Sequence, residues 1–432
     1  MATDLFTPIL NDRTRSVRFF NGRLLSGEAM TDEQSGQRAA RALLAQAVGD
    51  GIAQGYGVTE AVRSSRVQSP VVSVTAGVAI NRRGEILLLA SDTEVNLVRP
   101  THPATAPASL FQACTPPQQG VYVADAGVYL LTVCSIGAAN GLASSSGAGG
   151  SVGVQTSCNA KYIVDAVQFR LLELPVDDAT LLDVARLRNL VAYQCFGVDG
   201  LLDFAHDPFG TAGPPHTLLD DLRDTKQLTD CDVPLALLYW TATGGIQFLD
   251  LWSVRRRVTR TSMPLHPLLT DQRLATAEAM VQQFREQLDS ILKTASPLGT
   301  FRAKTSFRWL PPAGIVPVAD GTGAAGFAVD TFFSGKTWNR HRTWTNPIYM
   351  ESGRLEALLR AAAHYPPIDL DDKEMLWLYS VRRITRAPSR TLSRALFGAR
   401  AAPTYAVFAN ANLPFYGEPR FDREHWSYAN FL

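Results

Sequence analysis

The chain has 432 residues, of which 46% are apolar and 19% charged, and its formal net charge is +1. This composition excludes an intrinsically disordered chain, and the balanced charge excludes a dominant basic face that would bind nucleic acid. At roughly 150 residues per domain, the length predicts two to three domains. We expect an α+β, β-rich multi-domain fold: a small N-terminal hairpin–helix–meander module, then β-rich units with a few helices.

Residues 1–100 are predicted to form an N-terminal docking module. Asn21 and Gly22 indicate a type I′ hairpin turn. A helix follows, with Thr31 and Gln34 as its capping box, and three or four short strands complete the module. Because hairpin, helix and strands each present one apolar face, we expect them to share a small core. Its members would be Phe19, Leu24, Leu43, Leu44, Val74 and Ile86.

A β-rich middle domain is predicted over residues 119–260, after a proline-rich linker at 100–119. It contains one expected helix, over residues 179–195. No charged residue occurs from 126 to 160, a stretch that we interpret as a buried strand followed by a flexible Gly/Ser loop rather than a membrane insertion. The predicted strands cover residues 121–134, 162–174, 233–241 and 246–254.

Residues 261–300 are predicted to be a connecting segment built on a helix over residues 271–293. Its apolar residues recur at steps of three and four, the pattern of a heptad seam. Two interpretations remain open, self-association between subunits and packing on the same chain. The candidate interface residues are Leu274, Val281, Phe284, Leu288 and Ile291.

A C-terminal β-rich domain is predicted over residues 301–432. Residues 249–256 and 376–383 share the pattern L-x-L-aromatic-S-V-R-R, which indicates either a duplicated β unit or chance reuse of a strand pattern. Each copy ends in a pair of arginines. These arginines either shield a strand edge or bind a partner. The four arginines, which we take as candidate interface residues, are Arg255, Arg256, Arg382 and Arg383.

No catalytic signature occurs in the chain, so we predict no catalytic residues, no metal site and no cofactor. Paired histidines at helical spacing, a nucleophile elbow and a phosphate-binding lysine motif are all missing from the sequence. We expect Asp369, Asp371 and Asp372 to form a turn, because the glycine and glutamate of a calcium loop are missing. The nearest group of metal-ligating types is expected to be solvated in a loop: Asp203, His206, Asp207 and His216.

The compartment is predicted from what the sequence lacks. There is no apolar core of signal-peptide length near the start and no apolar run near the ~20 residues that span a bilayer. The five cysteines are odd in number, widely spaced and without a C-x-x-C, which favours free thiols in a reducing compartment. We therefore expect assembly in the cytoplasm and no membrane span.

Several short segments of the N-terminal module resemble a known family. They are residues 19–26 (FFNGRLLS) with 32–34 (DEQ), residues 55–58 (GYGV), residues 74–81 (VTAGVAIN) and residues 84–86 (GEI). The family consists of baseplate- or fibre-associated proteins of contractile, phage-tail-like injection systems. The resemblance is clear over residues 17–90 and weaker around residues 233–236, Trp252 and residues 310–314.

The resemblance implies a non-enzymatic structural or adaptor protein that acts by protein–protein assembly. Its expected partners are other subunits of the particle, in a homo- or hetero-oligomer, and neither nucleic acid nor a membrane. The family supplies no catalytic residues. The alternative function is a carbohydrate- or receptor-binding β protein, which exposed tryptophan and tyrosine clusters beside Asp or Asn would favour.

Overall fold

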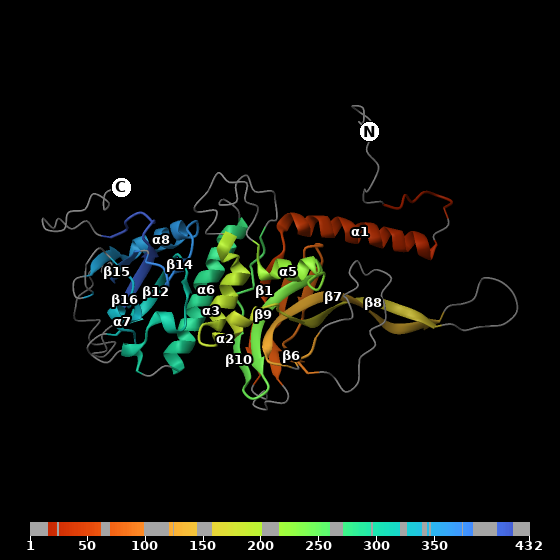
Figure 1. Cartoon of the computed structure of the whole chain (residues 1–432). Helices are drawn as coiled ribbons and strands as arrows, with labels where there is room; N and C mark the ends of the chain where they lie inside the picture. The colour runs from red at the N-terminus through yellow and green to blue at the C-terminus, as the bar shows by residue number, and fades with distance from the viewer. Residues whose placement is uncertain are drawn as a thin grey trace, which may run out of the picture.

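The structure is a computed structural model that describes residues 16–23, 26–61, 70–98, 121–123, 125–144, 158–200, 216–259, 271–294, 297–319, 326–338, 344, 347–373, 375–382 and 404–417. These residues include helices and several small β-sheets (Figure 1). The fold is therefore α+β, β-rich and multi-domain, as the sequence predicts. Among the described residues, no helix is long and apolar enough to cross a bilayer. The proline-rich segment 100–119 lies outside them.

The first helix among the described residues is the long helix α1 (Gly27–Val48). Its N-cap is Ser26, whose Oγ accepts a hydrogen bond from Ala29 N at 3.1 Å. The capping box predicted at Thr31 is wrong, because the helix has already begun one turn earlier. The helix ends at Gly49, whose φ of +117° is a conformation that glycine adopts at little cost.

The turn predicted at Asn21 and Gly22 is present. Gly22 has a φ of +90°, and Arg23 N donates to Phe20 O at 3.2 Å. The described residues before the turn form no strand, so the prediction of a hairpin at this position is not met there.

Strands β1 to β6 follow α1 and form two antiparallel sheets, with the orders β1–β4–β5 and β2–β3–β6. The strands predicted in this region correspond to β2 to β5, whereas β1 and β6 were not predicted. The bounds are β1 (Gly51–Gly55), β2 (Val58–Glu60), β3 (Val71–Val74), β4 (Gly77–Ile80), β5 (Ile86–Leu89) and β6 (Thr93–Asn96).

The central sheet is antiparallel and has the order β10–β9–β7–β8. Strand β9 reaches only to Cys134 on β7, whereas β7 and β8 continue as a pair to Ser144 and Cys158. The two long strands therefore project beyond the sheet as a ribbon, which extends to the right in Figure 1. The strands are β7 (Gly127–Ser144), β8 (Cys158–Glu173), β9 (Asp232–Thr241) and β10 (Gly245–Asp250).

Three helices pack with the central sheet. They are α2 (Asp178–Leu182), α3 (Leu187–Phe196) and α5 (Leu218–Asp224). The single helix predicted over residues 179–195 is interrupted between α2 and α3. At the break, the carboxylate of Asp183 accepts hydrogen bonds from Arg186 N at 3.3 Å and from Arg186 Nε at 2.7 Å. This local pairing satisfies backbone groups that a continuous helix would use, so the chain turns.

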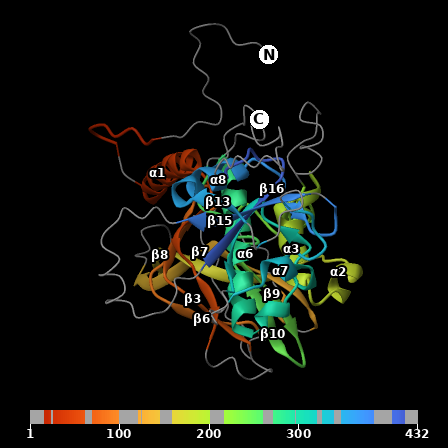
Figure 2. The ribbon, with the colours of Figure 1, turned by 90° about the vertical axis from the view of Figure 1, so that its left-hand side faces the viewer.

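The predicted connecting helix is confirmed as α6 (Asp271–Thr294). It lies beside α3, between the central sheet and the C-terminal strands (Figures 1 and 2). Shorter helices follow it along the chain. They are η3 (Leu298–Thr300), η4 (Ala303–Thr305), α7 (Val329–Phe332), η5 (Ser352–Arg354) and α8 (Leu355–Ala362).

The C-terminal sheet has the order β12–β16–β15–β13, and β13 runs parallel to β15. Helix α8 packs on one face of it through Leu358 and Ala362, and α6 covers the other face through Phe284. A small additional sheet pairs β11 (Trp309–Leu310) with β14 (Ile368–Asp369). The main strands are β12 (Ala313–Val318), β13 (Ile348–Glu351), β15 (Leu376–Arg382) and β16 (Thr404–Asn410).

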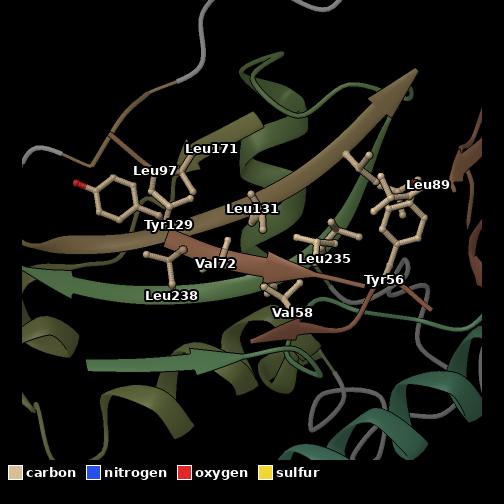
Figure 3. Close-up of a cluster of buried hydrophobic side chains, with 14 of the residues drawn as sticks. Tyr56, Val58, Val72, Leu89, Leu97, Tyr129, Leu131, Leu171, Leu235 and Leu238 are labelled. Atoms are coloured by element: carbon tan, nitrogen blue, oxygen red, sulfur yellow. The ribbon is translucent and has the colours of Figure 1, made fainter. Parts of the chain in front are cut away.

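The N-terminal strands share one hydrophobic cluster with the central sheet. Tyr56 and Val72 pack with Leu131 and Leu235, as Figure 3 shows. The separate N-terminal core predicted from the sequence is wrong. Val74 is buried, but in this shared cluster, and Leu24 lies outside the described residues. The other expected members are exposed: Phe19, Leu43, Leu44 and Ile86.

The two L-x-L-aromatic-S-V-R-R segments do not occupy equivalent places. Strand β10 is an edge strand that ends at Asp250, and residues 251–254 form a turn. Strand β15 lies between an antiparallel and a parallel neighbour in its own sheet. Because the strand neighbours differ, the duplication hypothesis is wrong and the sequence match is a coincidence.

Candidate functional site: buried junction and assembly surfaces

The heptad seam of α6 packs on its own chain. Phe284 is only 2% exposed, and its ring centroid lies 5.3 Å from that of Phe307 and 5.4 Å from that of Phe408. Leu288 is buried in the same cluster. These two candidate interface residues are therefore core residues. For them, the interpretation that the seam packs on its own chain is correct, and self-association is not. The remaining candidates are half-buried: Leu274, Val281 and Ile291.

Arg255 binds the backbone of the N-terminal strands. Its Nη2 donates to Gly55 O at 2.6 Å and its Nη1 donates to Tyr56 O at 2.9 Å. Tyr56 has a φ of +53°, an unusual conformation for a residue with a side chain. The two hydrogen bonds help to hold this strained corner, so Arg255 joins the segment after β10 to the start of the fold.

Arg256 also has its partners inside the chain. Its Nη1 donates to Trp252 O at 2.8 Å and its Nη2 donates to Ser253 O at 3.1 Å. The guanidinium lies 5.0 Å from the ring centroid of Phe196, and burial lowers the pKa of Arg256 to about 10. Arg382 is the last residue of β15, whereas Arg383 lies outside the described residues.

A buried polar junction joins β10, α3 and α6 around Asp250, which is fully buried. Its Oδ2 accepts hydrogen bonds from Arg188 Nε at 2.6 Å and from Gln283 Nε2 at 3.1 Å. Its Oδ1 accepts from Ser253 Oγ at 2.6 Å. A buried carboxylate is tolerated only when it is paired and hydrogen-bonded, and Asp250 meets both conditions.

The junction continues into the C-terminal part of the chain. Buried Asn189 of α3 accepts hydrogen bonds from the backbone N–H groups of Arg308 and Trp309, both at 2.9 Å, and donates to Trp309 O at 3.0 Å. Glu286 of α6 joins the same junction, because Trp252 Nε1 donates to it at 2.8 Å and Arg188 Nη2 lies 3.7 Å from it; burial raises the pKa of Glu286. Residues from three separate parts of the sequence therefore meet at α6.

A second buried ion pair lies within the central sheet. Arg170 Nη1 is 2.6 Å from Asp232, and both side chains are almost completely buried. Asp232 also accepts hydrogen bonds from Thr132 Oγ1 at 3.2 Å and Thr229 Oγ1 at 2.6 Å. These bonds link β7, β8 and β9 through buried side chains.

The described residues hold no group of three or more His, Cys, Asp or Glu side chains that could bind a metal ion. His216 bonds Asp221 at 2.8 Å, while the rest of its predicted group lies outside the described residues. The acidic run forms a turn, as expected, in which Asp369 accepts from Asp371 N at 2.8 Å.

The prediction of free cysteines is correct for two residues and wrong for one. Cys134 and Cys195 are free and buried. Burial raises the pKa of each thiol to about 12, so neither is an activated nucleophile. Cys231 is disulfide-bonded. Wide spacing and an odd count therefore did not exclude a bridge.

The exposed face of α1 is the first of two candidate assembly surfaces. The helix is held by small or polar contacts: Gln46 donates to Arg82 O at 3.3 Å, and Gly84 lies so close that a Cβ there would be 2.1 Å from Ala42 O. The larger apolar side chains of its last turns face away from the molecule, and Leu44 is 71% exposed. With Leu43 and Val48, it forms what we call the α1 surface.

The β7–β8 ribbon is the second surface. It carries exposed apolar side chains on β8, of which Tyr162 is 57% exposed and Val164 is also exposed. Helix α1 lies along this ribbon (Figure 1), and Arg38 pairs with Asp165 at 3.2 Å. An isolated two-stranded ribbon is marginally stable in water, so such a projection gains most from a partner.

Sequence reasoning missed the residues of the junction and of the ribbon. Asn189, Asp250 and Gln283 belong to segments whose contacts are set by the tertiary fold, so no local pattern identifies them. The ribbon did leave a signal, because residues 126–160 carry no charge. That signal was interpreted as a strand and a loop, and the strand proved longer than expected.

No protein-family model matches this chain, and no curated protein sequence is significantly similar to it.

Proposed function

We propose that the chain is a non-enzymatic structural or adaptor component of a contractile, phage-tail-like injection particle, assembled in the cytoplasm. The observation that carries this proposal is the α1 surface, where large apolar side chains of a long helix face solvent. Burying such a side chain is worth about 1.5–3 kcal/mol, so a helix that exposes several of them gains stability from a docked partner.

The position of the α1 surface in the chain supports the same proposal. Residues 17–90, which resemble baseplate- or fibre-associated proteins, contain α1 and β1 to β5. Helix α1 contacts the turn between β4 and β5 through Gln46 and Ala42, and these two strands contribute Ala79 and Leu87 to the shared cluster. An exposed apolar helix joined to a packed β structure suits a protein that acts by protein–protein assembly.

The alternative, a carbohydrate- or receptor-binding β protein, has less support. Sugar sites use exposed aromatic rings beside polar groups. The tryptophans within the described ranges are buried or half-buried. Exposed Tyr162 lies beside Lys161, whose Nζ is 5.1 Å from the ring centroid, and opposite Asn140, but one tyrosine on the ribbon is not the cluster of rings that this alternative expects. We therefore keep assembly as the proposed function.

The test is capture of particle subunits by the immobilised full-length chain. We expect baseplate or fibre subunits to bind, and a Leu43→Asp/Leu44→Asp double variant to bind at least about tenfold more weakly, as for a docking hot spot. The matched control is Leu182→Asp, because Leu182 is even more exposed but lies on α2. Equal capture by both variants would count against the α1 surface.

A further inference from the structure

Within the part of the chain that the structure describes, strand β8 has an open edge along the projecting ribbon. In the central sheet it is the terminal strand, and β7 is its neighbour. Near the base of the ribbon, Val121 N donates to Leu171 O at 3.0 Å, so Leu171 points its carbonyl away from β7. Alternate residues of an antiparallel strand point their N–H and C=O groups to the same side. Ile163 lies eight residues before Leu171, and the pairing of β8 with β7 is regular between the two. The backbone N–H and C=O groups of Ile163 therefore also point to the open edge.

The open edge lacks the usual protection against pairing. Natural edge strands carry charges, prolines or bulges that prevent another strand from adding. From Cys158 to Phe169, β8 contains no proline and has only two charged residues, Lys161 and Asp165. Its register with β7 shows no irregularity between Tyr162 and Glu173. The edge is thus without a bulge over these residues, nearly uncharged and able to accept a strand.

The two charges are placed so that the strand is complementary to itself. We propose that β8 pairs antiparallel with β8 of a second copy of the chain, on a two-fold axis at Ile163. In this register Lys161 of each copy faces Asp165 of the other, and Tyr162 faces Val164. Opposite charges and an aromatic ring opposite a β-branched residue are both favourable cross-strand pairs. The chain thus carries the charge complementarity that this dimer needs.

The proposed dimer has a defined geometry. The two-fold axis of an antiparallel strand pair is perpendicular to the sheet, so the two ribbons form one four-stranded sheet. Ile163 forms a hydrogen-bonded pair with its own copy, with the two Cα atoms about 5.5 Å apart. Both copies of α1 then lie on the same face of that sheet, because α1 lies over the ribbon face that carries Asp165.

The first test is cross-linking of the full-length chain through an introduced cysteine. Ile163→Cys is expected to form a covalent dimer under mild oxidation, because Cα atoms about 5.5 Å apart can be bridged by a disulfide. The matched control is Ala166→Cys on the same strand, whose two copies would lie about 20 Å apart. Absence of a dimer with Ile163→Cys, or equal dimer with Ala166→Cys, would overturn the proposal. The wild-type chain measures any contribution from the native cysteines.

The second test is charge inversion, measured by sedimentation equilibrium. Lys161→Asp and Asp165→Lys each place like charges opposite one another twice, and we expect each to weaken the dimer at least about tenfold. The double variant Lys161→Asp/Asp165→Lys restores both opposite-charge pairs and should dimerise like an Arg38→Gln variant, which likewise lacks the intrachain Arg38–Asp165 pair. Circular dichroism confirms that each variant is folded.

A wild-type chain that stays monomeric up to its solubility limit would contradict the pairing, as would a double variant that does not recover. The inference deepens the proposed assembly function but is tested without any particle. Failure of β8 pairing would therefore leave the particle assignment intact, and failure of that assignment would leave the dimer intact.

Discussion

The salt bridge between Arg170 of β8 and Asp232 of β9 is buried within the central sheet. We predict that Asp232→Asn lowers the free energy of unfolding by about 3–5 kcal/mol, because it leaves a buried guanidinium without its counter-charge. Urea unfolding of the full chain measures this change. The control is Glu356→Gln, which removes an exposed pair with Arg360 at 2.7 Å and should cost under about 1 kcal/mol. Equal effects of the two substitutions would contradict the prediction.

The buried thiols make a second residue-scale prediction. Burial raises the pKa of Cys134 and Cys195 to about 12, so both should resist alkylation in the folded chain at pH 8 and react after unfolding. Mass spectrometry of the alkylated chain provides the measurement. Because the folded-state pKa lies above the unfolded value of 9.0, the stabilisation is complete below pH 9 and is lost as the pH rises toward 12. Rapid labelling of either cysteine at pH 8 would show that it is accessible.

Single residues of the candidate site were only partly predictable. The sequence identified Arg255 and Arg256 as a conspicuous pair, but both bind carbonyl groups of their own chain. Asp250 looks like any strand-end aspartate, and only the fold brings it to Arg188. A charged residue whose partner is far away in the sequence leaves no local pattern. Sequence reasoning therefore identified the arginines but not the groups that they bind.

Helix α6 is the element whose role the structure decides. We predict that Phe284→Ala lowers the free energy of unfolding by about 3–5 kcal/mol, because its ring fills the space between Phe307 and Phe408. The control Arg285→Ala, one position along and exposed, should change it by no more than about 0.5 kcal/mol. Chemical denaturation compares the two. If Phe284→Ala instead dissociated an oligomer of folded chains, the intrachain assignment of the seam would be wrong.

Elements with strong local patterns were predicted well. The heptad period located α6, and a continuous apolar run located β9. Errors arose where a nearby polar side chain competed with the pattern: Ser26 begins α1 early, and Asp183 interrupts the helix between α2 and α3. The direction of the apolar stripe on α1 was also misjudged. Periodicity shows that a helix has an apolar face, but not whether its own chain covers that face.

The whole molecule is connected through α6 and the buried junction. Asn189 bonds the backbone of Arg308 and Trp309, and Gln287 of α6 donates to Ser306 O at 3.0 Å. We therefore predict one cooperative thermal transition for the wild-type chain in calorimetry. Asn189→Ala leaves buried backbone groups unpaired and should separate the transition into two. Two transitions in the wild type would show that the junction does not couple its parts.

At this scale, the sequence predicted the fold class but not the arrangement. Composition and strand patterns are local properties, so the α+β, β-rich class followed from them. The shared cluster of Tyr56, Val72 and Leu131 joins strands that are far apart in the chain. For the same reason the matching segments around Trp252 and Trp377 suggested a duplication that the sheet topology excludes.

The central claim, that this chain is a subunit of a contractile particle, is tested most directly by density-gradient sedimentation. Particles from cells that express the chain are separated from free protein, and each fraction is probed for the chain. Our account predicts that the wild-type chain sediments with the particles and that the Leu43→Asp/Leu44→Asp variant remains at the top of the gradient with a native circular dichroism spectrum. Recovery of the wild-type chain only in the free-protein fractions would contradict the account.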